Sequence, residues 1–270
     1  MDLPLFLYGT AWKEDATERL VRLAIENGFR GIDTANQRRH YFEAGVGEAI
    51  AGAIRDGIVR RDELFLQTKF TYADSQDDRL PYDANGDPAT QVRQSFSSSL
   101  EHLRTDTIDS FVLHGPSIDR GLADVDWQVW RAMESLPVRS LGISNVTLDQ
   151  LRELCDGAKV QPHFVQNRCF ARTHWDREVR AFCRERGITY QGFSLLTANV
   201  RDLQHSAFWE IVDEHERTPA QVVFRFAIGA GILPLTGTTN GEHMRQDVDV
   251  FDFELTPDQI AVIENIAFMR

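Results

Sequence analysis

Short apolar runs alternate with amphipathic stretches along the whole chain. The apolar run Leu5 to Tyr8 is followed by residues 15–27, in which Leu20, Leu23 and Ala24 recur at helical spacing. Short apolar runs of this kind indicate buried strands, and amphipathic stretches indicate helices that cover them. The chain therefore begins as a strand followed by a helix.

The same pairing recurs until eight strand-helix units are complete. So many short strands, each followed by a helix, favour a closed parallel barrel of the (β/α)8 TIM type over an open α/β sheet. No linker or low-complexity segment interrupts the series, so we expect residues 1–270 to form a single domain. The expected strands are 5–8, 29–33, 64–68, 108–113, 140–143, 164–166, 189–193 and 232–235. The expected helices are 15–27, 43–55, 89–103, 125–135, 148–157, 176–186, one ending near Gly229, a short one near 242–248 and a terminal one over 257–267.

Composition narrows the possible partners. A hydrophobic fraction of 42% supports a large core, and a net charge of −12 argues against nucleic acid and anionic lipid as partners. No apolar run approaches the roughly 18 residues of a membrane span, and the first residues lack the basic region of a secretion signal. We therefore expect a cytoplasmic monomer that acts on a small molecule. Cys155, Cys169 and Cys183 show no CxxC spacing and are expected to be buried thiols.

In a barrel of this type, the carboxyl ends of the strands and the loops after them form the mouth of the active site. Asp33, Lys69 and His114 follow or close three consecutive expected strands, so they should meet at this mouth. Other polar residues end later strands: Ser144, Asn145, Gln166, Asn167 and Ser194.

These residue types suit proton transfer to a carbonyl group. Lys69 and Asp33 can form an ion pair, and an ammonium ion lowers the pKa of a neighbouring phenol. A tyrosine so tuned can give its proton to a carbonyl oxygen, and Tyr41 is the candidate in the loop after Asp33. His114 can donate a hydrogen bond to the same oxygen. Such a site fits hydride transfer to a carbonyl from a cofactor.

Two other chemistries use the same residues. A zinc site is disfavoured, because Lys69 repels a cation and neither HExxH nor paired His/Cys spacing occurs; we expect no metal. Lys69 could instead be the Schiff-base lysine of an aldolase, although an ion-paired lysine stays protonated and is a poor nucleophile.

The sequence carries no dinucleotide-binding fingerprint of the GxGxxG type after a strand. Residues 45–48 (GVGE) fall inside an expected helix and are discounted. Barrels instead bind phosphates in the loops after strands seven and eight, beside helix N-termini. Here these loops are residues 193–197 and 235–240, and the second offers Gly237, Thr238 and Thr239.

Taken in order, a set of strand-end motifs resembles the aldo/keto reductase family along nearly the whole chain. The motifs are GIDTA (31–35), LQTK (66–69), LH (113–114), GISN (142–145), VQN (165–167), FS (193–194) and GTT (237–239). The resemblance implies an oxidoreductase that reduces an aldehyde or ketone with NADPH, or with NADH as the alternative. It implies Tyr41 as general acid, Lys69 and Asp33 as its tuning pair, and His114 as the group that orients the carbonyl. The implied cofactor-binding residues are Ser144, Asn145 and Gln166 at the nicotinamide carboxamide, Phe193 stacked on its ring, and Ser194, Leu196, Gly237, Thr238, Thr239, His243 and Asp247.

The chain departs from the family pattern in several places. Arg38 stands where the family's tyrosine is common, and counting back from residues 46–48 reaches His40 or Tyr41; we take Tyr41, because Lys69 can tune a phenol. His243 and Arg245 are the only candidate partners of an adenosine 2′-phosphate, and Asp247 stands where asparagine is usual.

The loop 70–88 is long and is expected to carry Tyr72, Asp77, Asp78, Arg79 and Tyr82 over the mouth.

A second function competes with carbonyl reduction. In this alternative the protein has the same fold and binds the same nicotinamide cofactor, but it acts as a redox-sensing subunit with little turnover.

Overall fold

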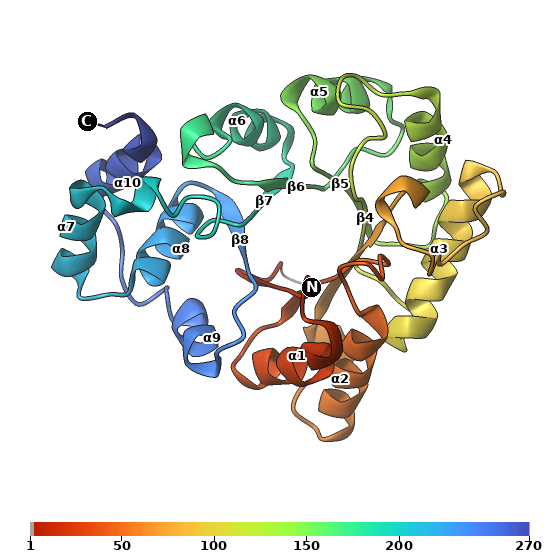
Figure 1. The fold of residues 1–270 in the computed structure, drawn as a ribbon, viewed down its shortest axis with the longest axis horizontal. Coiled ribbons are helices and arrows are strands. Elements are labelled where there is room, and N and C mark those ends of the chain that lie inside the picture. The colour runs from red at the N-terminus through yellow and green to blue at the C-terminus, as the bar shows by residue number, and fades with distance from the viewer. Residues whose placement is uncertain (1–2, 270) are drawn as a thin grey trace.

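The computed structural model describes residues 3–269. Eight parallel strands pair in sequence order, and β8 pairs with β1, which closes the sheet into a barrel (Figure 1). The expected (β/α)8 barrel is confirmed, with strand bounds within a few residues of those expected. The strands are β1 (Leu7–Gly9), β2 (Gly31–Asp33), β3 (Phe65–Phe70), β4 (Ser110–Leu113), β5 (Ser140–Ser144), β6 (Phe164–Arg168), β7 (Thr189–Phe193) and β8 (Ile232–Thr236).

The helices form a ring outside the strands, as Figure 1 shows in a view along the barrel. The terminal helix is shorter than expected, because it ends at Glu264 and residues Ile266–Phe268 form a separate 3-10 turn. No helix within residues 3–269 is both long and apolar enough to cross a membrane. The helices are α1 (Thr17–Glu26), α2 (Glu43–Arg55), α3 (Pro88–Leu103), α4 (Asp124–Met133), α5 (Leu148–Gly157), α6 (Arg177–Arg186), α7 (Ser206–His215), α8 (Pro219–Gly229), α9 (Gly241–Val248) and α10 (Pro257–Glu264).

The segment after β7 holds two helices where one was expected. Glu216 ends α7 in the left-handed conformation, with φ of 53°. Thr218 then caps α8, because its Oγ1 accepts from the backbone N–H of Gln221 at 3.3 Å, and Pro219 occupies the first turn. The Thr-Pro pair therefore starts a new helix, whose end at Gly229 agrees with the expectation.

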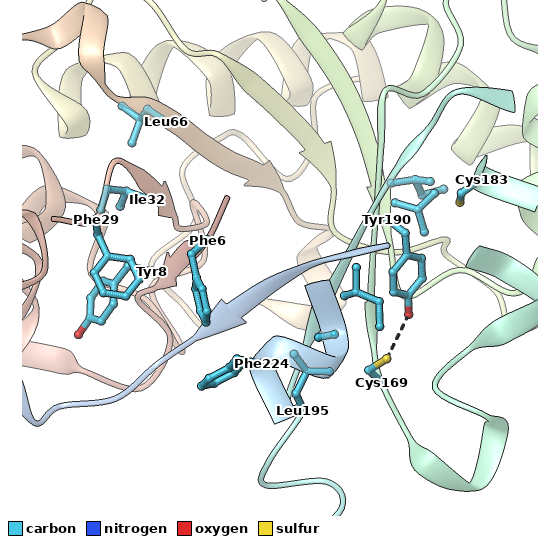
Figure 2. Close-up of a cluster of buried hydrophobic side chains, with 14 of the residues drawn as sticks. Phe6, Tyr8, Phe29, Ile32, Leu66, Cys169, Cys183, Tyr190, Leu195 and Phe224 are labelled. Carbon is cyan, nitrogen blue, oxygen red and sulfur yellow. Dashed lines mark hydrogen bonds between the residues drawn. The ribbon is translucent and has the colours of Figure 1, made fainter. Parts of the chain in front are cut away.

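An apolar core lies between the strands and the helices (Figure 2). Phe6 packs edge-on against Phe224 of α8, with ring centroids 4.8 Å apart, and against Phe29 at 5.8 Å. Such aromatic pairs stabilise a fold by roughly 1 kcal/mol beyond the area that they bury. The cysteines Cys155, Cys169 and Cys183 are buried and unpaired within the described chain, as expected.

Side chains inside the barrel are arranged in layers. Because alternate residues of each strand point inward, a step of two residues along a strand moves one layer toward the mouth. In β3, this step leads from the buried Phe65 to Gln67 and then to Lys69. The lower layer is apolar, and the layer above it is polar. The apolar layer is Leu7, Phe65, Phe164 and Leu235; the polar layer is Asp33, Gln67, Gln166 and Gln191.

Gly47 has a packing role in α2. The segment 45–48 lies wholly inside this helix, so it does not form a phosphate-binding turn. A Cβ atom at Gly47 would lie 2.0 Å from the backbone oxygen of His102 in α3. Glycine is therefore required there because the two helices approach closely.

Candidate active site

An ion pair between Asp33 and Lys69 lies at the centre of the mouth. The Lys69 Nζ donates to Asp33 Oδ1 at 2.7 Å, to Asp33 Oδ2 at 2.8 Å and to the backbone oxygen of Thr34 at 2.8 Å. The Lys69 side chain is 0% exposed and that of Asp33 is 3% exposed. Burial lowers the pKa of Lys69 and the Asp33 carboxylate opposes this change. Three acceptors satisfy an ammonium group completely, so Lys69 presents no free group to a ligand.

Three glutamine side chains form a layer below Asp33, and two of them donate to its carboxylate. Gln67 and Gln166 each donate to Asp33 Oδ1, at 2.7 and 2.9 Å. Both also donate to Gln191 Oε1, at 2.8 and 2.9 Å, and Gln191 donates back to Gln67 Oε1 at 3.0 Å. This amide layer, formed by Gln67, Gln166 and Gln191, fixes the carboxylate that holds Lys69. Because Gln166 uses its amide hydrogens here, its Oε1 is the atom left for a ligand.

Tyr41 lies in the loop between β2 and α2, above the ion pair. Its ring centroid is 5.5 Å from Lys69 Nζ and 5.9 Å from the ring centroid of His114. The pKa of Tyr41 is raised above its usual value, first by burial and then by the Asp33 carboxylate. The prediction that Lys69 lowers this pKa was wrong, because Asp33 offsets the ammonium charge and leaves burial as the main effect.

His40, the alternative to Tyr41, lines the same cavity as Tyr41 and contacts the loop after β1. Its ring lies tilted by 39° against that of Trp12, which follows β1, with the ring centroids 4.0 Å apart, and its Nδ1 is 2.9 Å from Gln37 Oε1. The backbone oxygen of His40 accepts from the N–H of Trp12 at 2.7 Å. These contacts tie the loops after β1 and β2 together, and they direct the His40 ring to Trp12.

His114 follows β4 directly, as expected, and it is held on three sides. Its backbone N–H donates to the oxygen of Phe70 at 2.9 Å, and its own oxygen accepts from Asn145 Nδ2 at 2.8 Å. Its ring Nδ1 is 2.6 Å from Thr71 Oγ1. Burial and the Lys69 charge lower the pKa of His114 to about 3. The imidazole is therefore neutral at physiological pH.

These residues surround a cavity of about 1040 Å³ that extends from Tyr41 and His114 to the loop after β8 and to α9. Asp33 lines it, whereas Lys69 lies beneath and is not on its wall. Every residue expected to bind the cofactor lines the cavity: Ser144, Asn145, Gln166, Phe193, Ser194, Leu196, Gly237, Thr238, Thr239, His243 and Asp247.

Asp247 of α9 lies at the end of the cavity away from His114. It is 2% exposed, and its Oδ2 has no hydrogen-bond partner among residues 3–269. Burial raises the pKa of this carboxyl to about 7. His243 also lines this end, but Arg245 does not: it pairs with Glu242 and lies beside a second, separate hollow.

Lys13, in the loop after β1, was missed by the sequence analysis. Its Nζ donates to the backbone oxygen of Gly237 at 2.7 Å and lies 5.0 Å from the ring centroid of Tyr8. The residue is 6% exposed, and burial lowers its pKa to about 8. The rule applied to the other strands would have found it, because Lys13 follows the end of β1 on the same side of the barrel.

The expectation that Asn167 lies at the mouth was wrong, and the expectation for the loop 70–88 is confirmed for Tyr72 alone of the five residues named. Asn167 points away from the cavity, because its Oδ1 accepts from the N–H of Val146 and its Nδ2 donates to Asp176. In the loop 70–88, Tyr72 lines the cavity but Tyr82 is buried behind it, with its hydroxyl on the oxygen of Thr71 at 2.7 Å. The other three residues expected there, Asp77, Asp78 and Arg79, do not line the cavity.

The rival chemistries find little support in this geometry. Within the described residues there is no group of three or more His, Cys, Asp or Glu side chains that could hold a metal ion. A Schiff-base lysine must meet a carbonyl carbon, but Lys69 is fully buried and its ammonium is occupied by Asp33 and Thr34.

Comparisons with known proteins agree on one family. The family model described as "Aldo/keto reductase family" matches residues 7–267. An aldo-keto reductase of Mycolicibacterium vanbaalenii is 31% identical over 266 residues, which cover 98% of this chain and 88% of that protein. The glyoxal reductase of Bacillus subtilis is 28% identical over 270 residues, covering 98% of this chain and 89% of that protein.

Solved structures give the same result. An aldo-keto reductase enzyme from a Medee basin deep-sea metagenome library superposes with a TM-score of 0.82 at 26% identity, covering 98% of this chain and 92% of that one. The aldo-keto reductase of Bombyx mori in complex with NADP shares the fold with a TM-score of 0.81 at 24% identity, covering 98% of this chain and 89% of that one.

Proposed function

The chain belongs to the aldo/keto reductase family and is an NAD(P)H-dependent oxidoreductase; we propose that it reduces a small aldehyde or ketone, with Tyr41 as general acid and His114 as carbonyl orienter. The observation that carries this proposal is the arrangement of the two rings. Tyr41 and His114 lie 5.9 Å apart on the cavity wall, above the buried pair of Asp33 and Lys69.

The cavity fits NADPH, the cofactor that the Bombyx mori relative holds as NADP. Near His114, the free Oε1 of Gln166, the Oδ1 of Asn145 and the hydroxyl of Ser144 are suited to a carboxamide, and the Phe193 ring to stacking. Lys13 and the loop Gly237–Thr239 offer a cation, hydroxyls and backbone N–H groups for phosphates. The unpartnered Asp247 Oδ2 needs a donor, and an adenine amino group is one. The same cavity is also lined by Ser194, Leu196 and His243.

The residues of the chain supply the proton and the orientation. The reduced nicotinamide, when bound, supplies the hydride for the carbonyl carbon. The Tyr41 hydroxyl gives its proton to the carbonyl oxygen, whose bond to carbon becomes single. His114, neutral and beside Tyr41, donates a hydrogen bond to the same oxygen and fixes its position. The raised pKa of Tyr41 keeps its proton in place until the oxygen becomes basic.

The test of this function is turnover. The protein is mixed with NADPH, or with NADH, and with a panel of small aromatic and aliphatic aldehydes and ketones, and the absorbance of the reduced cofactor is followed. We expect the absorbance to fall with a subset of the panel. Tight NADPH binding without turnover would favour the redox-sensing subunit instead.

Replacing Lys13 with methionine should weaken NADPH binding by about tenfold, because a charge-assisted hydrogen bond to a phosphate is lost. Since the pKa of Lys13 is about 8, the dissociation constant of the wild type should also rise as the pH passes upward through 8. That rise should be absent in Lys13→Met. Fluorescence titration measures both effects, and the exposed Lys159→Met controls for net charge. If Lys13→Met and Lys159→Met bound NADPH with equal affinity, Lys13 would not be part of the cofactor site.

The catalytic step should be insensitive to pH over the range in which histidine normally titrates. His114, with a pKa of about 3, and Tyr41, with a raised pKa, both stay neutral between pH 5 and 8. With saturating NADPH and substrate, kcat for reduction should therefore show no ionisation of His114 or Tyr41 in that range. A kcat that falls as the pH drops through 6.5 would mean that His114 is exposed to protonation in the working enzyme.

A further inference from the structure

Thr71 is the residue that holds the ring of His114. It follows β3, beside β4, and its Oγ1 lies 2.6 Å from His114 Nδ1. The backbone of Thr71 is fixed in turn, because its oxygen accepts the hydroxyl of Tyr82 at 2.7 Å. Thr71 is 2% exposed. The contact therefore joins two residues whose backbones are both anchored.

The direction of this hydrogen bond decides which nitrogen of His114 carries the proton. A neutral imidazole has one N–H, and its other nitrogen is an acceptor. Within residues 3–269, His114 Nδ1 is the hydrogen-bond partner that the structure gives to Thr71 Oγ1. If the hydroxyl accepted from Nδ1–H, its own hydrogen would have no acceptor among residues 3–269, although Thr71 also lines the cavity, and a donor left unpaired in the interior costs about 1–3 kcal/mol. If it donates to Nδ1, both groups are satisfied.

We propose that Thr71 is a positioning residue that holds His114 as the Nε2–H tautomer. Nδ1 is then the acceptor, and the ring nitrogen that is not occupied by Thr71 carries the hydrogen. His114 thereby presents a donor, rather than a lone pair, to the carbonyl oxygen of the substrate. An imidazole with the opposite tautomer would repel that oxygen. The effect on catalysis rests on the proposed carbonyl reduction, whereas the tautomer itself does not.

The test uses Thr71→Val, which keeps the shape of the side chain and removes the hydroxyl, and Thr71→Ala as a second variant without it. Thr71→Ser is the matched control, because it keeps the hydroxyl. Two-bond nitrogen-proton NMR spectra of protein labelled with 15N-histidine report the tautomer of each ring, and His114→Gln identifies the His114 signals. Steady-state kinetics with saturating NADPH report kcat and KM.

We expect the Nε2–H pattern for His114 in the wild type and in Thr71→Ser, and a mixture of tautomers in both variants without the hydroxyl. In those variants kcat/KM should fall by about tenfold, less than the loss of a whole oxyanion donor. NADPH affinity should be unchanged, because Thr71 makes no hydrogen bond to any residue proposed to bind the cofactor.

An Nδ1–H pattern in the wild type would overturn the proposal. So would an unchanged His114 spectrum in both Thr71→Val and Thr71→Ala. A wild type that reduces no carbonyl would contradict the proposed function, but the nitrogen spectra would still decide the role of Thr71.

Discussion

Replacing Tyr41 with phenylalanine should lower kcat for carbonyl reduction by about a thousandfold, within the range that general acid catalysis contributes. The variant loses the proton that passes to the carbonyl oxygen but keeps the ring that packs between Lys69 and His114. NADPH affinity should stay unchanged, because Tyr41 is not one of the residues proposed to bind the cofactor. Stopped-flow or steady-state kinetics and a fluorescence titration measure the two quantities.

The matched control is His40→Gln, which tests the alternative acid. His40 packs against Trp12 and bonds to Gln37, so its loss should change kcat far less than the loss of the Tyr41 hydroxyl. If Tyr41→Phe kept most of its activity while His40→Gln lost it, the acid would be His40.

Replacing Lys69 with methionine should have the largest effect on stability. The change leaves the Asp33 carboxylate buried without its counter-ion, and the loss of one partner of a buried pair costs about 3–5 kcal/mol. Gln67 and Gln166 still donate to Asp33, which favours the lower part of that range. Urea unfolding followed by circular dichroism measures the free energy of unfolding.

The double variant Asp33→Asn with Lys69→Met distinguishes the effect of the buried charge on the free energy of unfolding from the effect of side-chain packing. It is neutral, and the asparagine oxygen can still accept from the two glutamines. We expect it to be more stable than Lys69→Met alone, because no buried charge remains. A double variant that is less stable by the sum of the two single effects would show that the pair is not energetically coupled.

The sequence was sufficient to predict where Asp33, Lys69 and His114 meet. Each lies at or near the end of a strand, and barrel closure brings consecutive strand ends to one mouth. The expected cofactor residues share a cavity for the same reason. Their roles in catalysis remain predictions that the variants above test.

Contacts that depend on register and shear could not be read from the sequence. Gln67 and Gln191 are 124 positions apart and meet only across the barrel, so neither has a local signal. The contact of Thr71 with His114 likewise depends on how far β3 extends beside β4. By contrast, the break between α7 and α8 was readable, because Thr218 and Pro219 form a helix-start signal.

The sign of the pKa change at Tyr41 was wrong for a related reason. The sequence identified the ammonium of Lys69 but could not weigh it against the carboxylate that neutralises it or against the burial of the phenol. The balance of these effects depends on depth inside the protein, which a linear pattern does not report.

Asn145 and Ser194 follow β5 and β7 in the left-handed backbone region, with φ of 52° and 57°. Most residues other than glycine pay roughly 1–2 kcal/mol for this conformation, and asparagine tolerates it better than serine. Glycine at Ser194 would relieve that cost but remove a hydroxyl from the cavity wall, whereas glycine at Asn145 would also lose the hydrogen bond to the backbone oxygen of His114. A search for thermostable variants would therefore tend to select glycine at Ser194 and lose cofactor affinity as a result, so stability and activity compete at this residue.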